Sequence, residues 1–249
     1  MKRKNLSQQW SGNAAILPGI GIFKGSAGDN QTHCHWAHQL SIGLNDTVKI
    51  ISGNTTYSAA GIFVRAGTSH RLASDSVLSI YLDPTSILSQ RLTADFDSNL
   101  EIVKLPAELN RLLLKTFSDL DVVRQSTTAY HAALGIKLPQ QVDKRLTLVL
   151  DALHQSIQQQ SHLDRAAMAR LAKLSNSRFS HWFRQQTGMP LRSYKKWLQL
   201  LHGVEVALNG ESLTHAAHEA QFSDQAHFTR TFVQAFGISP ATALAHVNQ

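Results

Sequence analysis

The first ninety residues contain short apolar runs separated by glycines and polar turns, a pattern typical of β-strands. Examples are residues 48–51, 62–64 and 77–82, and Asp83 and Pro84 close the last of these runs. Short strands at this spacing predict a small barrel or sandwich.

Apolar residues recur at helical steps in the remainder of the chain. Residues 108–120 predict one helix, and Pro139 predicts the start of a second, whose apolar positions continue to Ile157. A domain boundary is expected near residues 135–142, which hold Gly135 and Pro139. The predicted divisions are residues 1–95, 96–138 and 139–249.

The strongest pattern is an internal repeat after residue 163. Each copy has two alanines, a polar residue, a pair of phenylalanines at helical spacing and a glycine. These are Ala169, Ala172, Ser175, Phe179, Phe183 and Gly188 in the first copy, and Ala217, Ala220, Ser223, Phe228, Phe232 and Gly237 in the second.

Each copy predicts a helix-turn-helix. Small alanines let a second helix pack closely across the first. Ser175 caps the second helix of the first copy, and Ser223 or Asp224 that of the second. Gly188 and Gly237 stand where a left-handed C-cap belongs, and a proline that starts the next helix follows each of them. The connector after Pro190, as a helix, would span roughly 28 Å, approaching the ~34 Å between successive major grooves.

The stretch Ala217–Phe232, followed by Phe236–Pro240, resembles the signature of the AraC/XylS family of transcription regulators. The resemblance implies a sequence-specific DNA-binding regulator with double-stranded DNA and RNA polymerase as partners. It also implies a barrel that binds a small-molecule effector, and residues 108–120 as the surface of a homodimer. Lys173 and Gln221 replace the family's turn glycines, and Gly203 weakens the connector helix.

Matching the motif by position divides the polar residues of the repeat into two predicted groups. Those expected to face base edges are Ser177, Ser180, His181, Gln225, His227, Thr229 and Arg230. Those expected to hold phosphates are Arg178, Arg184, Arg192, Lys195 and Lys196.

A second constellation lies in the N-terminal half. His33 and His35 alternate on a predicted strand, Gln39 follows, and His70 comes after a glycine-containing turn. The spacing resembles the two cupin motifs, with Gln39 in place of the usual glutamate. Three imidazoles can hold a divalent metal. An organic effector pocket and histidines merely satisfied by hydrogen bonds are the alternatives. The predicted fold class is therefore α+β: a cupin-like β-barrel, then helices, then an all-α domain of two helix-turn-helix units.

Composition narrows the function classes. The net charge of +7 favours an anionic partner, either nucleic acid or an acidic membrane face. The single cysteine, Cys34, excludes an internal disulfide and fits a reducing cytoplasm. No long apolar run follows the basic start, so we expect a cytoplasmic protein without membrane segments. The alternative function is a metal-dependent cupin enzyme with an appended helical domain, although no further acid, base or nucleophile set accompanies the histidines.

Overall fold

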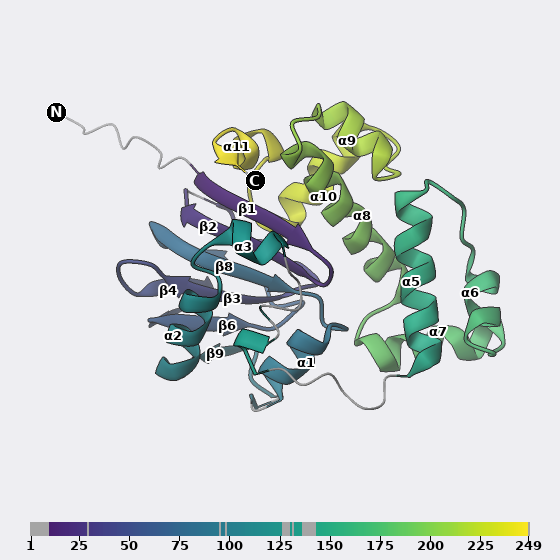
Figure 1. The fold of residues 1–249 in the computed structure, drawn as a ribbon, viewed down its shortest axis with the longest axis horizontal. Helices are drawn as coiled ribbons and strands as arrows, with labels where there is room; N and C mark the ends of the chain where they lie inside the picture. Colours follow the sequence, from purple (N-terminus) through teal and green to yellow (C-terminus); the bar gives the residue numbers. More distant parts are fainter. Residues whose placement is uncertain are drawn as a thin grey trace. The chain divides into compact units, whose positions relative to one another are not determined.

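The computed structural model describes residues 10–28, 30–94, 96–97, 99–125, 130, 132–135 and 143–248 (Figure 1). Two compact units make up the chain: residues 1–137 with residues 229–249, and residues 138–228. Helix α10 (Gln225–Phe236) begins in the second unit and ends in the first. The predicted boundary between residues 138 and 139 lies outside the described residues.

The N-terminal β-domain, the name used here for strands β1 to β9 and the loops between them, contains two β-sheets, and β10 from the C-terminal end of the chain extends the larger one. The large sheet has the order β10-β1-β2-β8-β3-β6-β9, and the small sheet has the order β5-β4-β7. The strands are β1 (Ser11–Leu17), β2 (Ile20–Ser26), β3 (His38–Gly43), β4 (Val48–Ser52), β5 (Thr55–Ala59), β6 (Gly61–Val64), β7 (Arg71–Leu72), β8 (Ser76–Leu82), β9 (Ile102–Lys104) and β10 (Val247–Asn248). Neighbouring strands are antiparallel except β10, which pairs in parallel with β1.

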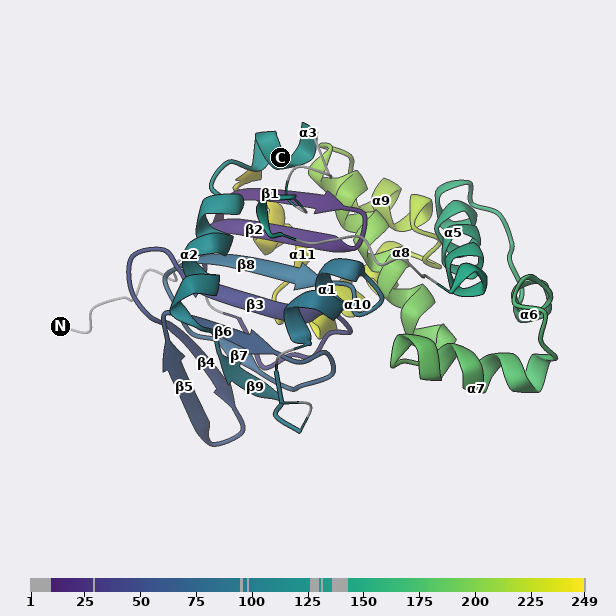
Figure 2. The same cartoon turned by 60° about the horizontal axis from the view of Figure 1, so that its bottom comes forward.

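The two faces of the large sheet carry different side chains. In β8, Leu78, Ile80 and Leu82 enter an apolar core, while Ser79 and Tyr81 alternate with them and point the other way. Helices α1 (Ile87–Thr93), α2 (Ala107–Thr116) and α3 (Leu120–Gln125) cover the apolar face (Figure 2). The opposite face carries polar residues of β3 and β8 together with buried apolar side chains, among them Phe23, Ile62 and Val64.

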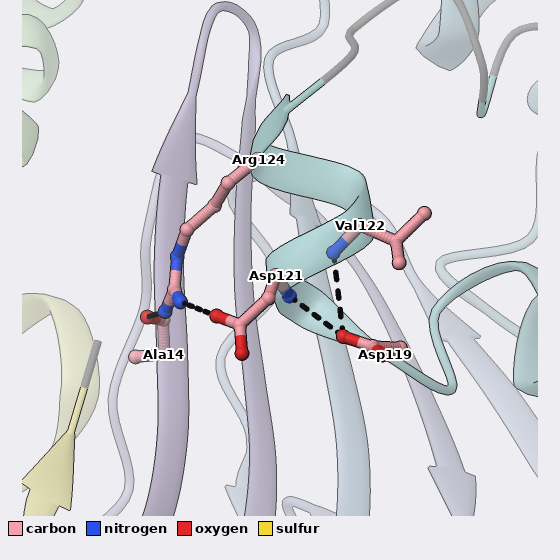
Figure 3. Close-up of polar contacts among 5 residues, drawn as sticks. All are labelled: Ala14, Asp119, Asp121, Val122 and Arg124. Atoms are coloured by element: carbon pink, nitrogen blue, oxygen red, sulfur yellow. Dashed lines mark hydrogen bonds and ion pairs between the residues drawn. The ribbon is translucent and has the colours of Figure 1, made fainter.

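The predicted helix 108–120 is two helices, so that prediction is wrong in its extent. Phe117 leaves helical geometry, with φ −105° and ψ 25°. The side chain of Asp119 then accepts hydrogen bonds from the amides of Asp121 and Val122, at 2.9 and 3.3 Å, and so starts α3 (Figure 3). Leu113 and Leu120 belong to the core of the β-domain. A dimer contact on this segment would therefore have to use its polar face.

Arg124 fastens α3 to the large sheet. Its guanidinium donates to the carbonyl oxygen of Ala14 on β1 at 2.6 Å and pairs with Asp121 at 2.5 Å (Figure 3). The Asp121 carboxylate is largely exposed, so the ion pair mainly orients the arginine.

The second unit is helical. It contains α5 (Lys144–Gln158), α6 (Arg165–Leu171), α7 (Asn176–Thr187), α8 (Leu191–Leu208), α9 (Leu213–Glu219) and the start of α10. The described part of the helix predicted from Pro139 begins at Lys144, where the Asp143 side chain accepts from the Arg145 amide; Pro139 itself lies outside the described residues. With helix α11 (Pro240–Leu244) after α10, the chain has the predicted α+β fold class. No helix among the described residues is long and apolar enough to cross a membrane.

The turns of the repeat have the predicted geometry. Gly188 and Gly237 end α7 and α10 with φ of 75° and 72°. Lys173 and Gln221, the residues in place of glycine, also have positive φ, 55° and 59°. The Asp224 carboxylate accepts from the His227 amide at 2.6 Å, which identifies Asp224 as a side-chain cap of α10. Ser175 holds the N-cap position of α7, but without a capping hydrogen bond from its own side chain in the described structure.

Gly203 has a packing role that the sequence did not reveal. A Cβ at this position would lie 2.6 Å from Cε2 of Phe228 and 3.1 Å from Cβ of Ala220. The glycine thus lets α8 approach the second helix-turn-helix closely, in addition to lowering the helix propensity of α8.

Candidate functional site

The exposed face of α7 carries the three base-facing residues predicted for the first repeat. Ser177, Ser180 and His181 are exposed, while Phe179 and Phe183 are fully buried and contact each other with ring centroids 5.8 Å apart. The aromatic pair therefore fixes which face of α7 points outward.

The predicted base-facing residues on α10 differ in how many contacts restrict their side chains. The side chain of Gln225 accepts a 2.7 Å hydrogen bond from the Thr214 hydroxyl of α9. Nδ1 of His227 lies 3.2 Å from the Ser223 hydroxyl, and its ring stands edge-on to Phe222. Thr229 is half-buried, and Arg230 is exposed. Arg230 thus has the longest reach from this helix.

Within their bounds, α7 and α10 contain no Asp or Glu; the exposed carboxylate of Asp224, which caps the start of α10, is the nearest negative charge on that helix. The predicted phosphate-binding residues lie near them in sequence: Arg178, Arg184 and Arg192 are exposed, and Lys195 and Lys196 are half-buried. The Arg178 guanidinium donates a long, 3.4 Å hydrogen bond to the Ser175 hydroxyl. Most of these cations are available to an anionic partner.

A cluster of three histidines, His33, His35 and His70, lies in the loops of the N-terminal β-domain. His33, His35 and His70 are all buried, and each offers a ring nitrogen within 4.8 Å of the others. Their ring centroids are 4.4 Å apart for His33 and His70, 5.1 Å for His35 and His70, and 5.8 Å for His33 and His35. His33 and His70 also exchange backbone hydrogen bonds of 2.9 Å. The structure therefore brings together the three histidines that the motif predicted.

Backbone carbonyls orient all three imidazoles. Nδ1 of His33, His35 and His70 lies 2.8–2.9 Å from the carbonyl oxygens of Gln31, Ala37 and Thr68, respectively. A carbonyl oxygen only accepts, so each Nδ1 is the protonated nitrogen and donates. Each Nε2 is then left with a lone pair.

Gln39, the fourth predicted residue, lies beside two of these nitrogens. Its Oε1 is 2.9 Å from Nε2 of His35 and 2.9 Å from Nε2 of His70. Its amide nitrogen donates to the Ser41 hydroxyl at 2.7 Å, and that hydroxyl lies 3.4 Å from the hydroxyl of Ser79. The polar face of β3 and β8 thus supports Gln39 from behind.

Burial keeps the cluster neutral. It is the main cause that lowers the pKa of His35 to about 3 and that of His33 to about 4; the nearby imidazoles lower both further. The pKa of His70 is also lowered, again by burial. Neutral imidazole is the form that binds metal ions.

His38, next to Gln39 in the sequence, has a different role. Its Nδ1 accepts a 2.9 Å hydrogen bond from the Ala66 amide. Burial and the nearby Arg65 lower its pKa to about 4. His38 is therefore a structural residue with a satisfied acceptor, and it makes a natural control for the other three.

The C-terminal segment of the same unit covers the cluster, which the sequence did not predict. The amide of Gln31 donates to the Gly237 carbonyl at 2.8 Å, and the amide of Cys34 donates to the Gln234 carbonyl at 3.2 Å. The Phe236 ring lies 6.5 Å from that of His35 and 5.6 Å from that of Tyr81. The only available hint was the polar residue alternation in β3 and β8, which shows a polar face but not what covers it.

Comparisons with known proteins agree with this description. Residues 168–246 match the family model described as a helix-turn-helix domain. A crystal structure of apo ToxT from Vibrio cholerae is similar in fold, with a TM-score of 0.59 at 12% identity, covering 94% of this chain and 99% of that one. Unsaturated-fatty-acid-bound ToxT from the same organism has a TM-score of 0.57 at 11% identity, covering 99% and 98%. No curated protein matches the chain significantly in sequence.

Proposed function

We propose, from the premise that residues 168–246 form an AraC-type helix-turn-helix domain, that this protein is a sequence-specific transcription regulator whose DNA binding is controlled by a ligand in the N-terminal β-domain. The observation that carries the proposal is the repeat itself: α7 and α10 each bury an aromatic pair and expose an acid-free polar face. A metal-dependent enzyme built on the histidines alone would not require two such helices.

The residues on these faces suit base recognition. Arg230 can donate two hydrogen bonds to guanine, and Gln225 can pair with adenine. The contact from Thr214 holds Gln225 in one orientation before DNA binds, which lowers the entropic cost of recognition. On α7, short serines and His181 read fewer base edges, so α10 is the stronger reader.

The ligand is proposed to enter the β-domain. The related fold of ToxT has been seen with an unsaturated fatty acid. The face described here combines imidazole, amide and hydroxyl groups with the buried apolar side chains of Ile62 and Val64. The buried polar groups favour a ligand that offers polar atoms or charge to them. RNA polymerase and a second copy of the chain are the further partners proposed from the family resemblance.

Mapping the sites bound by the full-length protein across its native genome, followed by footprinting of one site, tests the proposal. We expect protection of two major-groove segments about one helical turn apart on one DNA face. An Arg230→Ala variant supplies the control, because its footprint should weaken at one segment first. Protection of a single segment, or no protection at low salt, would contradict the two-reader proposal.

A further inference from the structure

Three polar side chains, those of Ser223, Asp224 and His227, form a hydrogen-bonded chain at the start of α10. The Ser223 hydroxyl donates to one oxygen of the Asp224 carboxylate at 3.1 Å, and the same hydroxyl oxygen lies 3.2 Å from Nδ1 of His227. The other oxygen of Asp224 accepts from the His227 amide at 2.6 Å. One carboxylate thus caps the helix and also anchors the hydroxyl that contacts the imidazole.

The carboxylate decides which nitrogen of His227 carries the proton. An ionised carboxylate only accepts hydrogen bonds, so the single proton of the Ser223 hydroxyl is committed to Asp224. The hydroxyl oxygen can then contact the imidazole only as an acceptor, so Nδ1 of His227 is the nitrogen that donates. In a neutral imidazole the other nitrogen, Nε2, therefore has no proton and offers a lone pair.

The ring of His227 is restrained by a second contact. The buried ring of Phe222 stands edge-on to it, with ring centroids 5.2 Å apart and an interplanar angle of 88°. Within the described part of the chain, Nε2 of His227 has no hydrogen-bond partner, and the side chain is half-buried. The ring is therefore oriented by Ser223 and Phe222 before DNA binds, and Nε2 is available to a partner in the groove.

We infer that His227 reads DNA as a hydrogen-bond acceptor: its Nε2 accepts from the exocyclic amino group of an adenine or a cytosine, and Ser223 is the positioning residue that sets this polarity. The inference rests on the proposed function, because it requires α10 to lie in a major groove. In that groove adenine N6 and cytosine N4 are donors, whereas guanine and thymine offer only acceptors. His227 should therefore favour adenine or cytosine over guanine or thymine on the strand it contacts.

Arg230 gives the same face of α10 the opposite polarity. His227 and Arg230 are three residues apart in the helix, so their side chains are neighbours on its surface. A guanidinium has only donors, so Arg230 requires acceptors such as those of guanine. Gln225 cannot make such a distinction, because its amide carries a donor and an acceptor side by side. The face is thus expected to specify one base through its amino group and one through its acceptors.

Nuclear magnetic resonance tests the tautomer without DNA. Full-length protein containing nitrogen-labelled histidine is measured at about pH 8, where an unperturbed imidazole is neutral, and the His227 signals are assigned by their loss in His227→Ala. We expect a protonated Nδ1 and an unprotonated Nε2. Ser223→Ala should abolish this preference, and Ser223→Thr, which keeps the hydroxyl, should retain it. His181 on α7 is the control, because its ring signals should not change in either variant.

Duplexes that lack single amino groups test the reading itself. The full-length protein selects a site from random-sequence DNA, and the segment whose protection Arg230→Ala weakens is remade with purine in place of each adenine, or an analogue without the amino group in place of each cytosine. One such deletion should weaken binding about 3- to 10-fold, the usual effect of one hydrogen bond. His227→Ala should lose the same factor on the intact site and nothing further on the altered one. Removal of N7 from the guanine read by Arg230 should stay costly in His227→Ala.

Several results would overturn the inference. In folded protein these are an Nε2-protonated or doubly protonated His227, or a tautomer that Ser223→Ala leaves unchanged. On DNA it is a site at which every amino-group deletion affects His227→Ala and the unmodified protein equally. Because Ser223 is exposed, Ser223→Ala provides the same DNA comparison if His227→Ala proves unstable by circular dichroism.

The proposed function is tested separately by the selection step. Protein that selects a DNA sequence but fails the tests on His227 would refute this inference alone. Protein that selects no sequence even at low salt would refute the proposed function and, with it, the reading of an amino group by His227.

Discussion

At the scale of single residues, the sequence predicted most local features, although Ser175 makes no capping hydrogen bond with its side chain. The left-handed turns at Gly188 and Gly237 and the cap at Asp224 follow from neighbouring residues. The three clustered histidines were predicted because a motif records their spacing. The contact between the Ser41 and Ser79 hydroxyls, which lies behind Gln39, could not be predicted, since these two residues meet only when β3 and β8 pair.

Arg230 and Lys196 should respond differently to truncation. If Arg230 pairs with guanine, Arg230→Ala should cost about 1–3 kcal/mol of specific binding and relax the preference at one base pair. Lys196→Ala should weaken binding to all sequences and reduce the slope of log K against log salt by about one. Titrations against matched and mismatched sites at several salt concentrations measure both. Equal behaviour of the two variants would show that Arg230 faces a phosphate.

The two non-glycine turn residues provide a second matched pair. Lys173 is exposed, so Lys173→Gly should relieve a left-handed strain of about 1 kcal/mol and raise the melting temperature of the helical unit slightly. The side chain of Gln221 instead donates to the carbonyl of Ser156 at 2.7 Å, so Gln221→Gly should give no gain because it removes that bond. Thermal unfolding followed by circular dichroism compares them. A gain in both variants would mean that the Gln221 contact contributes nothing.

At the scale of elements, periodicity predicted where helices and strands occur better than where they end. The break between α2 and α3 arises because the polar pair at 118–119 ends one helix and starts the next. Periodicity cannot register such a break, because Phe117 and Leu120 continue the apolar spacing into the same core. Gly203 is similar: as a helix residue it only weakens α8, and its value depends on Phe228 and Ala220 of other elements.

Gly203→Ala should therefore destabilise the protein although alanine favours helices. The propensity gain is about 1 kcal/mol, and overpacking against Phe228 costs roughly 1–3 kcal/mol. Chemical denaturation should show a net loss. The added substitution Phe228→Leu removes the clashing ring atom, so a double-mutant cycle should show favourable coupling of the two changes. Stabilisation by Gly203→Ala alone would mean that α8 and the second helix-turn-helix pack less closely than described.

At the scale of the whole molecule, one compact unit combines the two ends of the chain, so the units do not follow the order of the sequence. The last 21 residues, which continue the DNA-binding repeat in sequence, belong to the unit that contains the β-domain. β10 extends the large sheet beside β1, with Gly12 opposite Val247. No local pattern in residues 229–249 predicts this, because the partners lie at the opposite end of the chain. One helix, α10, thus takes part both in the proposed reading of DNA and in the proposed sensing of a ligand.

Substitutions at Gly237 and Gly188 distinguish the proposed DNA-reading role from the proposed ligand-sensing role. Both have φ near 75°, so alanine at either should cost about 1–2 kcal/mol through left-handed strain. A Cβ at Gly188 meets nothing within 4 Å, whereas at Gly237 it meets Gln31. Gly237→Ala should therefore also detach the turn and speed hydrogen exchange at the amides of Gln31 and Cys34, and Gly188→Ala should leave both amides unchanged. Equal exchange in the two variants would show that the end of α10 is not held by the β-domain, and that a ligand at the histidines has no route to this helix through Gln31.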